Sequence, residues 1–330
     1  MIDLLFSGVS FLTISFIFFG VAFGILVSAI PGLTTTIGVV LLLPFTYYLD
    51  SSSSLGMLMG VFVGGMAGGA IPAILINIPG NPASIVTNIN GYPLAKSGRG
   101  DFALGLALMS STIGALVGLV MLFLISPQLT DFALKFGAVE QFALVLLGLS
   151  LVSALSEKSV IKGYVSMCLG LMIATVGLDP ITAIPRYNFG TVAMQQGISF
   201  IPVMIGMFAI PTILESMVIT KDFKFPTIDK NFFECIKGVT NALKEIKNSK
   251  LNVIRSSIIG AIIGAIPGTG SAIAATLSYQ LTKKIEKSSD KNRMTSQGII
   301  SPEAANSAMS GGALIPMLTL GIPGDPVTAV

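Results

Sequence analysis

Long apolar stretches separated by short polar ones recur along the chain and predict a bundle of transmembrane helices. A helix crosses the hydrocarbon core of a bilayer with about 17 to 25 mainly apolar residues. The regular alternation of apolar and polar positions that marks a membrane β-barrel is not seen. The longer stretches are residues 4–30, 102–125, 141–155, 160–178 and 198–219, and four shorter ones beside Pro-Gly pairs are residues 34–49, 55–78, 256–266 and 304–322.

Two sequence elements occur twice, in the same order, and indicate an internal duplication. The first is Gly-Ile-Leu-Val-Ser-Ala-Ile-Pro-Gly at 24–32, which returns as Gly-Ala-Ile-Ile-Gly-Ala-Ile-Pro-Gly at 260–268. The second is Ile-Pro-Gly-Asn-Pro at 78–82, which returns as Ile-Pro-Gly-Asp-Pro at 322–326. An Ile-Pro pair precedes each copy of the second element at the same spacing. We therefore expect two related transmembrane repeats.

Each Pro-Gly pair predicts a break in a transmembrane helix. Proline removes a backbone donor and clashes with the preceding turn, and glycine permits left-handed or extended backbone. Broken backbone survives at membrane depth only where it lines a cavity or is buried in protein. Paired interrupted segments in the two halves of a chain point to the substrate site of a transporter. A simple kink or a turn outside the membrane is the alternative.

The residues around the breaks predict a site for a carboxylate. Several are helix N-cap types, and the N-terminus of a half-helix offers free N–H donors and a partial positive charge. Capping alone explains the hydroxyl groups equally well. The candidate substrate-binding residues are Gly32, Thr34, Thr35, Asn77, Gly80, Asn81, Ser84, Gly268, Thr269, Gly270, Ser271 and Gly324.

Two charged residues near the breaks are further candidates. Arg99 lies with Lys96 in a short Gly-flanked loop, and its guanidinium could bind a carboxylate through two hydrogen bonds. The alternative is that both residues only anchor the loop at the membrane interface. Asp325 stands where the first copy has Asn81, so it could help to bind a coupling cation. It could equally be an ordinary helix cap.

The distribution of charge predicts the orientation of the repeats. Thirteen of the 19 basic residues lie in two runs, at 220–255 and 283–293, which the positive-inside rule places in the cytoplasm. Acidic residues are mixed into both runs, which argues against a nucleic-acid patch. The counterpart of the second run holds Asp50 and no basic residue, so we expect inverted repeats. The expected parts are a first repeat at 1–219, a cytoplasmic linker at 220–250 with an amphipathic surface helix at 231–247, and an incomplete second repeat at 251–330.

The composition agrees with a membrane protein and argues against an enzyme. Charged residues make up 11% of the chain, against about 25% in soluble domains. Histidine, the usual general base and metal ligand, is absent. The two cysteines, Cys168 and Cys235, cannot form a metal cluster. We therefore expect no enzyme, cofactor or metal site, and Na⁺ or H⁺ only as a coupling ion.

These motifs resemble those of the large membrane subunit of tripartite tricarboxylate transporters, the TctA-like permeases. The resemblance implies a multi-pass permease of the bacterial inner membrane that imports a carboxylate with a cation. It also implies two partners, a small membrane subunit and a periplasmic solute-binding protein. A whole protein of about 500 residues is implied as well, so the chain would be C-terminally truncated, and an inactive fragment or a passive anion channel are the alternatives. The strings that carry the resemblance are residues 29–34, 77–80, 91–99, 185–190, 302–306 and 321–324.

Overall fold

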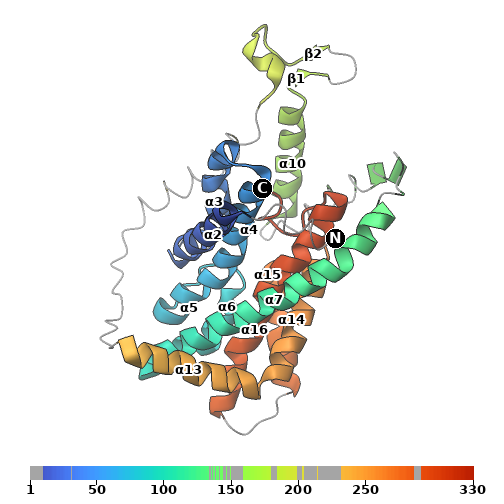
Figure 1. The fold of residues 1–330 in the computed structure, drawn as a ribbon. Coiled ribbons are helices and arrows are strands. Elements are labelled where there is room, and N and C mark those ends of the chain that lie inside the picture. Colours follow the sequence, from blue (N-terminus) through green and yellow to red (C-terminus); the bar gives the residue numbers. More distant parts are fainter. Residues whose placement is uncertain are drawn as a thin grey trace.

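The computed structural model describes a chain that is almost entirely helical. Figure 1 shows most of its helices lying side by side in a bundle. The predicted all-α class is therefore confirmed. Most of the predicted stretches 141–155 and 198–219 lies outside the described part. The described residues are 10–30, 32–133, 159–179, 184–198, 232–285 and 291–330, with isolated positions between 135 and 149 and at 203 and 214.

From α2 to α7 the helices follow one another with short connections. In the first half they are α2 (Phe11–Ala29), α3 (Thr35–Leu42), the 3₁₀ turn η1 (Leu43–Tyr48), α4 (Ser51–Gly68), α5 (Ala70–Ile76), α6 (Ser84–Leu94), the π turn η2 (Ala95–Arg99) and α7 (Gly100–Ala133). Later in the chain they are α10 (Val160–Ala174), the strands β1 (Gly177–Leu178) and β2 (Pro185–Arg186), the 3₁₀ turn η3 (Ala193–Gln196), α13 (Phe232–Asn248), α14 (Lys250–Gly264), α15 (Gly270–Ile285) and α16 (Lys291–Leu320).

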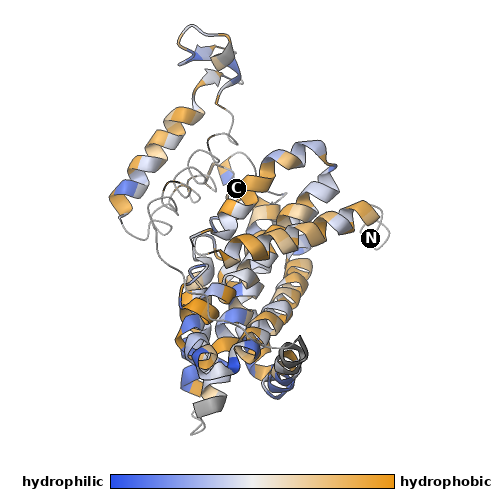
Figure 2. Cartoon of the chain, turned by 90° about the vertical axis from the view of Figure 1, so that its left-hand side faces the viewer, coloured by the Kyte–Doolittle hydropathy of each residue, from blue (hydrophilic) through white to orange (hydrophobic). Residues whose placement is uncertain are grey.

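Several helical stretches have the length and apolar surface of membrane spans. Large apolar side chains such as Phe18, Leu119 and Phe123 are exposed, and Figure 2 shows many hydrophobic residues along the long helices. Such surfaces suit contact with lipid chains. In the described part, three helical stretches are long and apolar enough to cross a membrane: Phe11–Ala29, Ser51–Ile76 and Ser84–Asp131. The chain is therefore a multi-pass membrane protein.

Side-chain caps fix where the first helices begin. The hydroxyl of Thr34 accepts the N–H of Ile37 at the start of α3, and Asp50 accepts the N–H of Ser53 at the start of α4. The hydroxyl and N–H of Ser53 also hold the pKa of Asp50 below its usual value. Ser10 caps α2 in the same way. Each cap satisfies a backbone donor that has no partner within its helix.

Glycines bring the backbones of crossing helices into direct contact. A methyl group on Gly24 of α2 would lie 2.4 Å from the carbonyl oxygen of Val61 on α4. Later in the chain, a methyl group on Gly260 of α14 would lie 2.1 Å from the carbonyl oxygen of Ala305 on α16. Both distances are too short for any side chain. Small residues allow this close approach of transmembrane helices.

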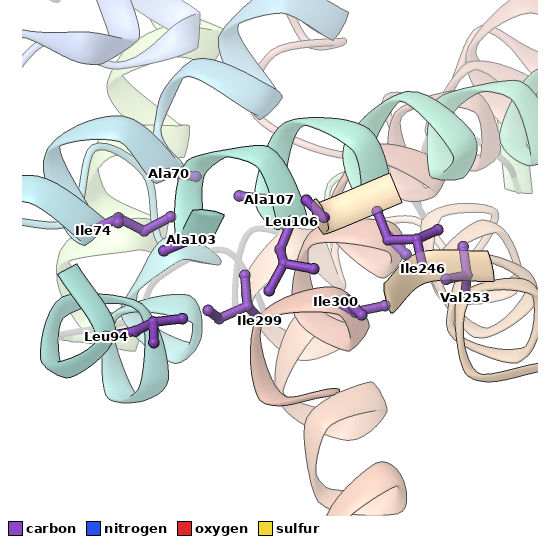
Figure 3. Close-up of a cluster of buried hydrophobic side chains, with 12 residues drawn as sticks. Ala70, Ile74, Leu94, Ala103, Leu106, Ala107, Ile246, Val253, Ile299 and Ile300 are labelled. Atoms are coloured by element: carbon purple, nitrogen blue, oxygen red, sulfur yellow. The ribbon is translucent and has the colours of Figure 1, made fainter. Parts of the chain in front are cut away.

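A cluster of buried apolar side chains ties the amphipathic helix α13 to the bundle (Figure 3). Ile246 of α13 packs in this cluster with Leu106 of α7, Val253 of α14 and Ile300 of α16. The helix predicted at 231–247 therefore forms, and part of its apolar face is buried against protein. Its position at the membrane surface stays a prediction.

A small β-hairpin interrupts the helical chain, and the sequence did not predict it. Gly177 of β1 pairs with Arg186 of β2 in an antiparallel ladder. Helix α10 ends at Ala174, before the expected end at 178. The φ of Gly177 is +123°, which a helix cannot accommodate. An ion pair between Arg186 and the buried Asp179 carboxylate closes the hairpin.

Replacing Gly24 or Gly260 by alanine should destabilise the bundle. We expect each variant to lose about 1–3 kcal/mol, because the added methyl group forces the crossing backbones apart. The matched control is Gly170→Ala in α10, where, among the described residues, no atom outside the adjacent turns of α10 lies within 4 Å of the new methyl group. Thermal unfolding of the purified protein in detergent, followed by circular dichroism, measures the difference. Equal melting temperatures for all three variants would contradict the close crossing.

Candidate functional site at the helix breaks

Three of the four Pro-Gly pairs lie between helices, as the sequence predicted, and the fourth follows the end of α16. The first break separates α2 from α3, and the third separates α14 from α15. The second follows α5, and the fourth follows α16. In order, the four breaks are at residues 31–32, 79–80, 267–268 and 323–324.

The first and second breaks lie against each other. A methyl group on Gly80 would lie 2.5 Å from the carbonyl oxygen of Ser28, in the last turn of α2. The N–H of Gly80 donates to the carbonyl oxygen of Gly69 at 3.2 Å. Across the first break, the hydroxyls of Ser28 and Thr35 are hydrogen-bonded at 3.2 Å. The second break therefore packs closely against the end of α2, while its Gly80 N–H is satisfied by the junction between α4 and α5.

The third and fourth breaks lie against each other in the same way. The N–H of Gly268 donates to the carbonyl oxygen of Gly324 at 3.0 Å. A methyl group on Gly324 would lie 2.7 Å from the Cα atom of Ala313. Gly69 and Gly80 occupy the positions of Ala313 and Gly324 in the first copy. A methyl group on Gly80 would likewise lie 2.7 Å from the Cα atom of Gly69. The two pairs of breaks therefore have closely similar local geometry.

Further contacts match between the two copies. Ile78 N–H donates to Pro72 O, and Ile322 N–H donates to Pro316 O, both at 3.3 Å. Left-handed backbone ends the helix before each break, at Asn77 and at Gly321. The same reciprocal cap follows, between Asn81 and Ser84 in one copy and between Asp325 and Thr328 in the other.

The segments that follow the four breaks gather in the interior. Val39 after the first break, Ala274 after the third and Val327 after the fourth belong to one apolar cluster. Ala83 after the second break packs with Ala275 after the third in another. In the described residues, the segments after the breaks therefore contribute side chains to shared apolar clusters.

Two asparagines join the second break to α16. The side-chain amide of Asn81 donates to Met66 O at 3.1 Å, and that of Asn306 donates to the same oxygen at 2.9 Å. Both side chains are buried, and Asn306 Oδ1 has no partner within the described part. The sequence offered one signal for Asn306, a strongly polar side chain within an apolar helix, and it was missed as a site residue.

Some predicted site residues have other local roles. Thr269 does not cap the helix after the third break, because its hydroxyl donates to Ile263 O and Ile266 O at the end of the preceding helix. Ser271 is buried in the first turn of α15. Arg99 is exposed in η2, with its guanidinium 4.5 Å from the ring centre of Phe102. The structure does not bring Arg99 together with the breaks, and its binding role stays a prediction.

A cavity of about 340 Å³ opens between α6, α15 and α16. Asn90, Tyr279, Thr282, Lys283 and Gly298 line it. Arg255 does not line the cavity, but it donates to Thr282, which does, and to Asn252. The cavity therefore offers hydrogen-bond donors and positive charge to an anion. Among the residues that the structure describes, no group of three or more His, Cys, Asp or Glu side chains could hold a metal ion.

Helices broken at matched positions inside a transmembrane bundle define a membrane transport protein. The chain belongs to the tripartite tricarboxylate transporter TctA family, whose model matches residues 14–330. It is 36% identical over 317 residues to an uncharacterised 52.8 kDa protein in the TAR-I ttuC' 3' region of Agrobacterium vitis. The aligned region is 95% of this chain and 61% of that protein, so the chain spans less than two thirds of its relative's length. No solved structure matches.

Exchanging the capping residues should affect the two copies differently. The Asn81→Asp variant keeps the cap, because its side chain can still accept the N–H of Ser84. It loses the amide N–H that donates to Met66 O, so a carboxylate oxygen would face that carbonyl oxygen. We expect this variant to be destabilised by about 1–3 kcal/mol. Asp325→Asn keeps its cap and should be tolerated, because Asn and Asp cap about equally well. Thermal unfolding of both purified variants measures this, and equal losses would refute the distinct role of the Asn81 amide.

Proposed function

We propose that the chain forms most of the permease subunit of a binding-protein-dependent secondary transporter for tricarboxylates or related carboxylates. The observation that carries the proposal is the pairing of broken helices, first with second and third with fourth, inside one bundle. Paired half-helices of this kind form the substrate and ion sites of secondary transporters. The matched contacts also support an internal duplication of the chain.

The proposed carboxylate site lies at the starts of the half-helices. The N-terminus of α3 at Thr34 and that of α15 at Gly270 carry backbone donors and partial positive charge. The hydroxyl of Thr34 already accepts a backbone N–H, so capping and substrate binding compete for it. Apolar side chains from three of the four segments pack around these starts. A carboxylate there would be held mainly by backbone N–H groups.

The proposed cation site uses the asymmetry between the copies. The Asn81 side chain donates a hydrogen bond to a carbonyl oxygen. Asp325 has a carboxylate at the equivalent position, and an ionised carboxylate can only accept hydrogen bonds. Thr328 bonds to one oxygen of that carboxylate, Oδ1. Asp325 is 3% exposed, so an uncompensated charge there would be costly. A bound Na⁺ or H⁺ would supply the missing positive charge.

The remaining parts of the proposal concern the cell. The basic runs at 220–255 and 283–293 favour a cytoplasmic position for the linker and for the second run, and opposite orientations of the repeats. We propose the bacterial inner membrane as its location, and a small membrane subunit and a periplasmic solute-binding protein as its partners, because membership of the family supports them. A passive anion channel would instead give uptake that does not saturate and does not depend on a cation gradient.

Uptake into proteoliposomes tests the proposal with the full-length protein and both partner subunits. We expect saturable uptake of radiolabelled di- or tricarboxylates that requires the binding protein and a Na⁺ or H⁺ gradient. Asp325→Asn should weaken the dependence on the gradient, on the order of tenfold, at normal expression. Gly170→Ala in α10 serves as the control and should behave as the unmodified protein. Uptake and cation dependence that survive Asp325→Asn intact would leave Asp325 as only a cap.

A further inference from the structure

Glu303 is a carboxyl group buried in the middle of the bundle. It lies on α16 and is 0% exposed. The hydroxyl of Thr87 on α6 donates to Oε1 at 2.5 Å, and that of Ser111 on α7 donates to Oε2 at 3.0 Å. Glu303 therefore links α16 of the second copy of the proposed repeat to α6 and α7 of the first. It lies well before the fourth break along the chain. The sequence gives no local signal for its role, because its partners Thr87 and Ser111 lie far away in the chain.

No positive charge is bonded to this carboxyl group in the described part of the chain. Helices α4 and α6 carry no charged residue. Asp101 and Asp131 lie near the two ends of α7, and Arg255 of α14 bonds to Asn252 and Thr282. The other titratable groups on the packed helices α14 and α15 are Lys250, Tyr279, Lys283 and Lys284, and all three lysines are exposed.

An ionised Glu303 carboxylate without a positive charge beside it would destabilise the folded protein. Ionised groups within a membrane bundle are costly unless they are paired. Hard cations in proteins take about six oxygen ligands, whereas the side chains bonded to Glu303 supply two. A hydroxyl can either donate to a carboxylate or accept from a carboxylic acid. Thr87 and Ser111 therefore suit a carboxyl group that gains and loses a proton better than one that holds a metal ion.

The cavity between α6, α15 and α16 is lined by the helices that carry Glu303 and Thr87. Asn90, which lines it, follows Thr87 by three residues on α6, a rise of about 4.5 Å. Gly298, which also lines it, precedes Glu303 by five residues on α16, a rise of about 7.5 Å. Pro302 lies between them and lacks an N–H, so the carbonyl of Gly298 is left without its usual helix donor. Polar groups thus extend from the cavity toward the carboxyl group.

We propose that Glu303 is a proton-binding site that exchanges its proton with water through this cavity. In the neutral form one hydroxyl accepts the carboxyl O–H and the other donates. On release, the O–H bond of the carboxyl group breaks, the proton passes to a water molecule in the cavity, and both hydroxyls donate to the carboxylate. The inference concerns proton binding by the bundle itself and does not depend on carboxylate transport. Any link to coupling rests on the proposed function.

Infrared spectroscopy of the purified full-length protein tests the site directly. We expect a C=O stretching band of a protonated carboxylic acid that shifts in D₂O, titrates with pH and is lost in Glu303→Gln. Asp50→Asn is the matched control, because it removes an exposed carboxyl group and keeps the helix cap, and it should leave this band unchanged. Gly298→Ala places a methyl group 2.3 Å from the Asn90 amide, narrows the cavity and should slow the D₂O shift. A band unaffected by Glu303→Gln would overturn the proposal, and unchanged exchange in Gly298→Ala would overturn the route.

Thermal stability gives a second readout that does not require transport. If the folded protein holds a proton that the unfolded chain releases, stability must fall as pH rises. We therefore expect the melting temperature of the unmodified protein to drop at alkaline pH by more than that of Glu303→Gln. Gln can still hydrogen-bond to both hydroxyls, so the variant should fold. Identical pH profiles would count against proton binding, whereas failure of uptake with the infrared band present would count only against the proposed function.

Discussion

A backbone N–H or C=O without a partner is costly within a bilayer, and this protein interrupts helices inside its apolar segments four times. The structure satisfies some of these exposed groups by setting the breaks against one another. Gly268 donates to Gly324, and Gly80 donates to Gly69 beside the end of α2. One break alone would leave such groups unpaired. The need to pair these backbone groups therefore constrains how the helices on either side of each break are arranged.

Close backbone contact is the second condition for this pairing. Gly24 and Gly260 allow α2 to reach α4 and α14 to reach α16, so that each helix end arrives beside the break of its partner helix. Larger residues would separate the helices by several ångströms and the hydrogen bonds at the breaks would be lost. The glycines at the crossings and the glycines at the breaks therefore serve the same arrangement, although they lie several turns apart.

The sequence revealed features that depend on local chemistry. Pro-Gly pairs predicted the breaks, Thr34 and Asp50 match the caps of α3 and α4, and the repeated strings predicted contacts that recur in both copies. Features that depend on distant partners were missed. The opposing positions of Thr87 and Glu303, and the shared bond of Asn81 and Asn306 to one carbonyl, arise only when the two halves pack. The hydroxyl of Thr269 donates to Ile263 O in α14, and N-cap preference alone does not predict this hydrogen bond.

The differences between the two copies bear most on function. Matched backbone contacts are explained by shared structure, but a carboxylate where the other copy has an amide changes the charge of the interior. Glu303 adds a second buried acid on the same side of the duplication, where the first copy has Met59. Neither acid is bonded to a basic side chain in the described residues. The second copy therefore holds both of these buried acids, and the proposed cation and proton sites rest on this difference between the copies.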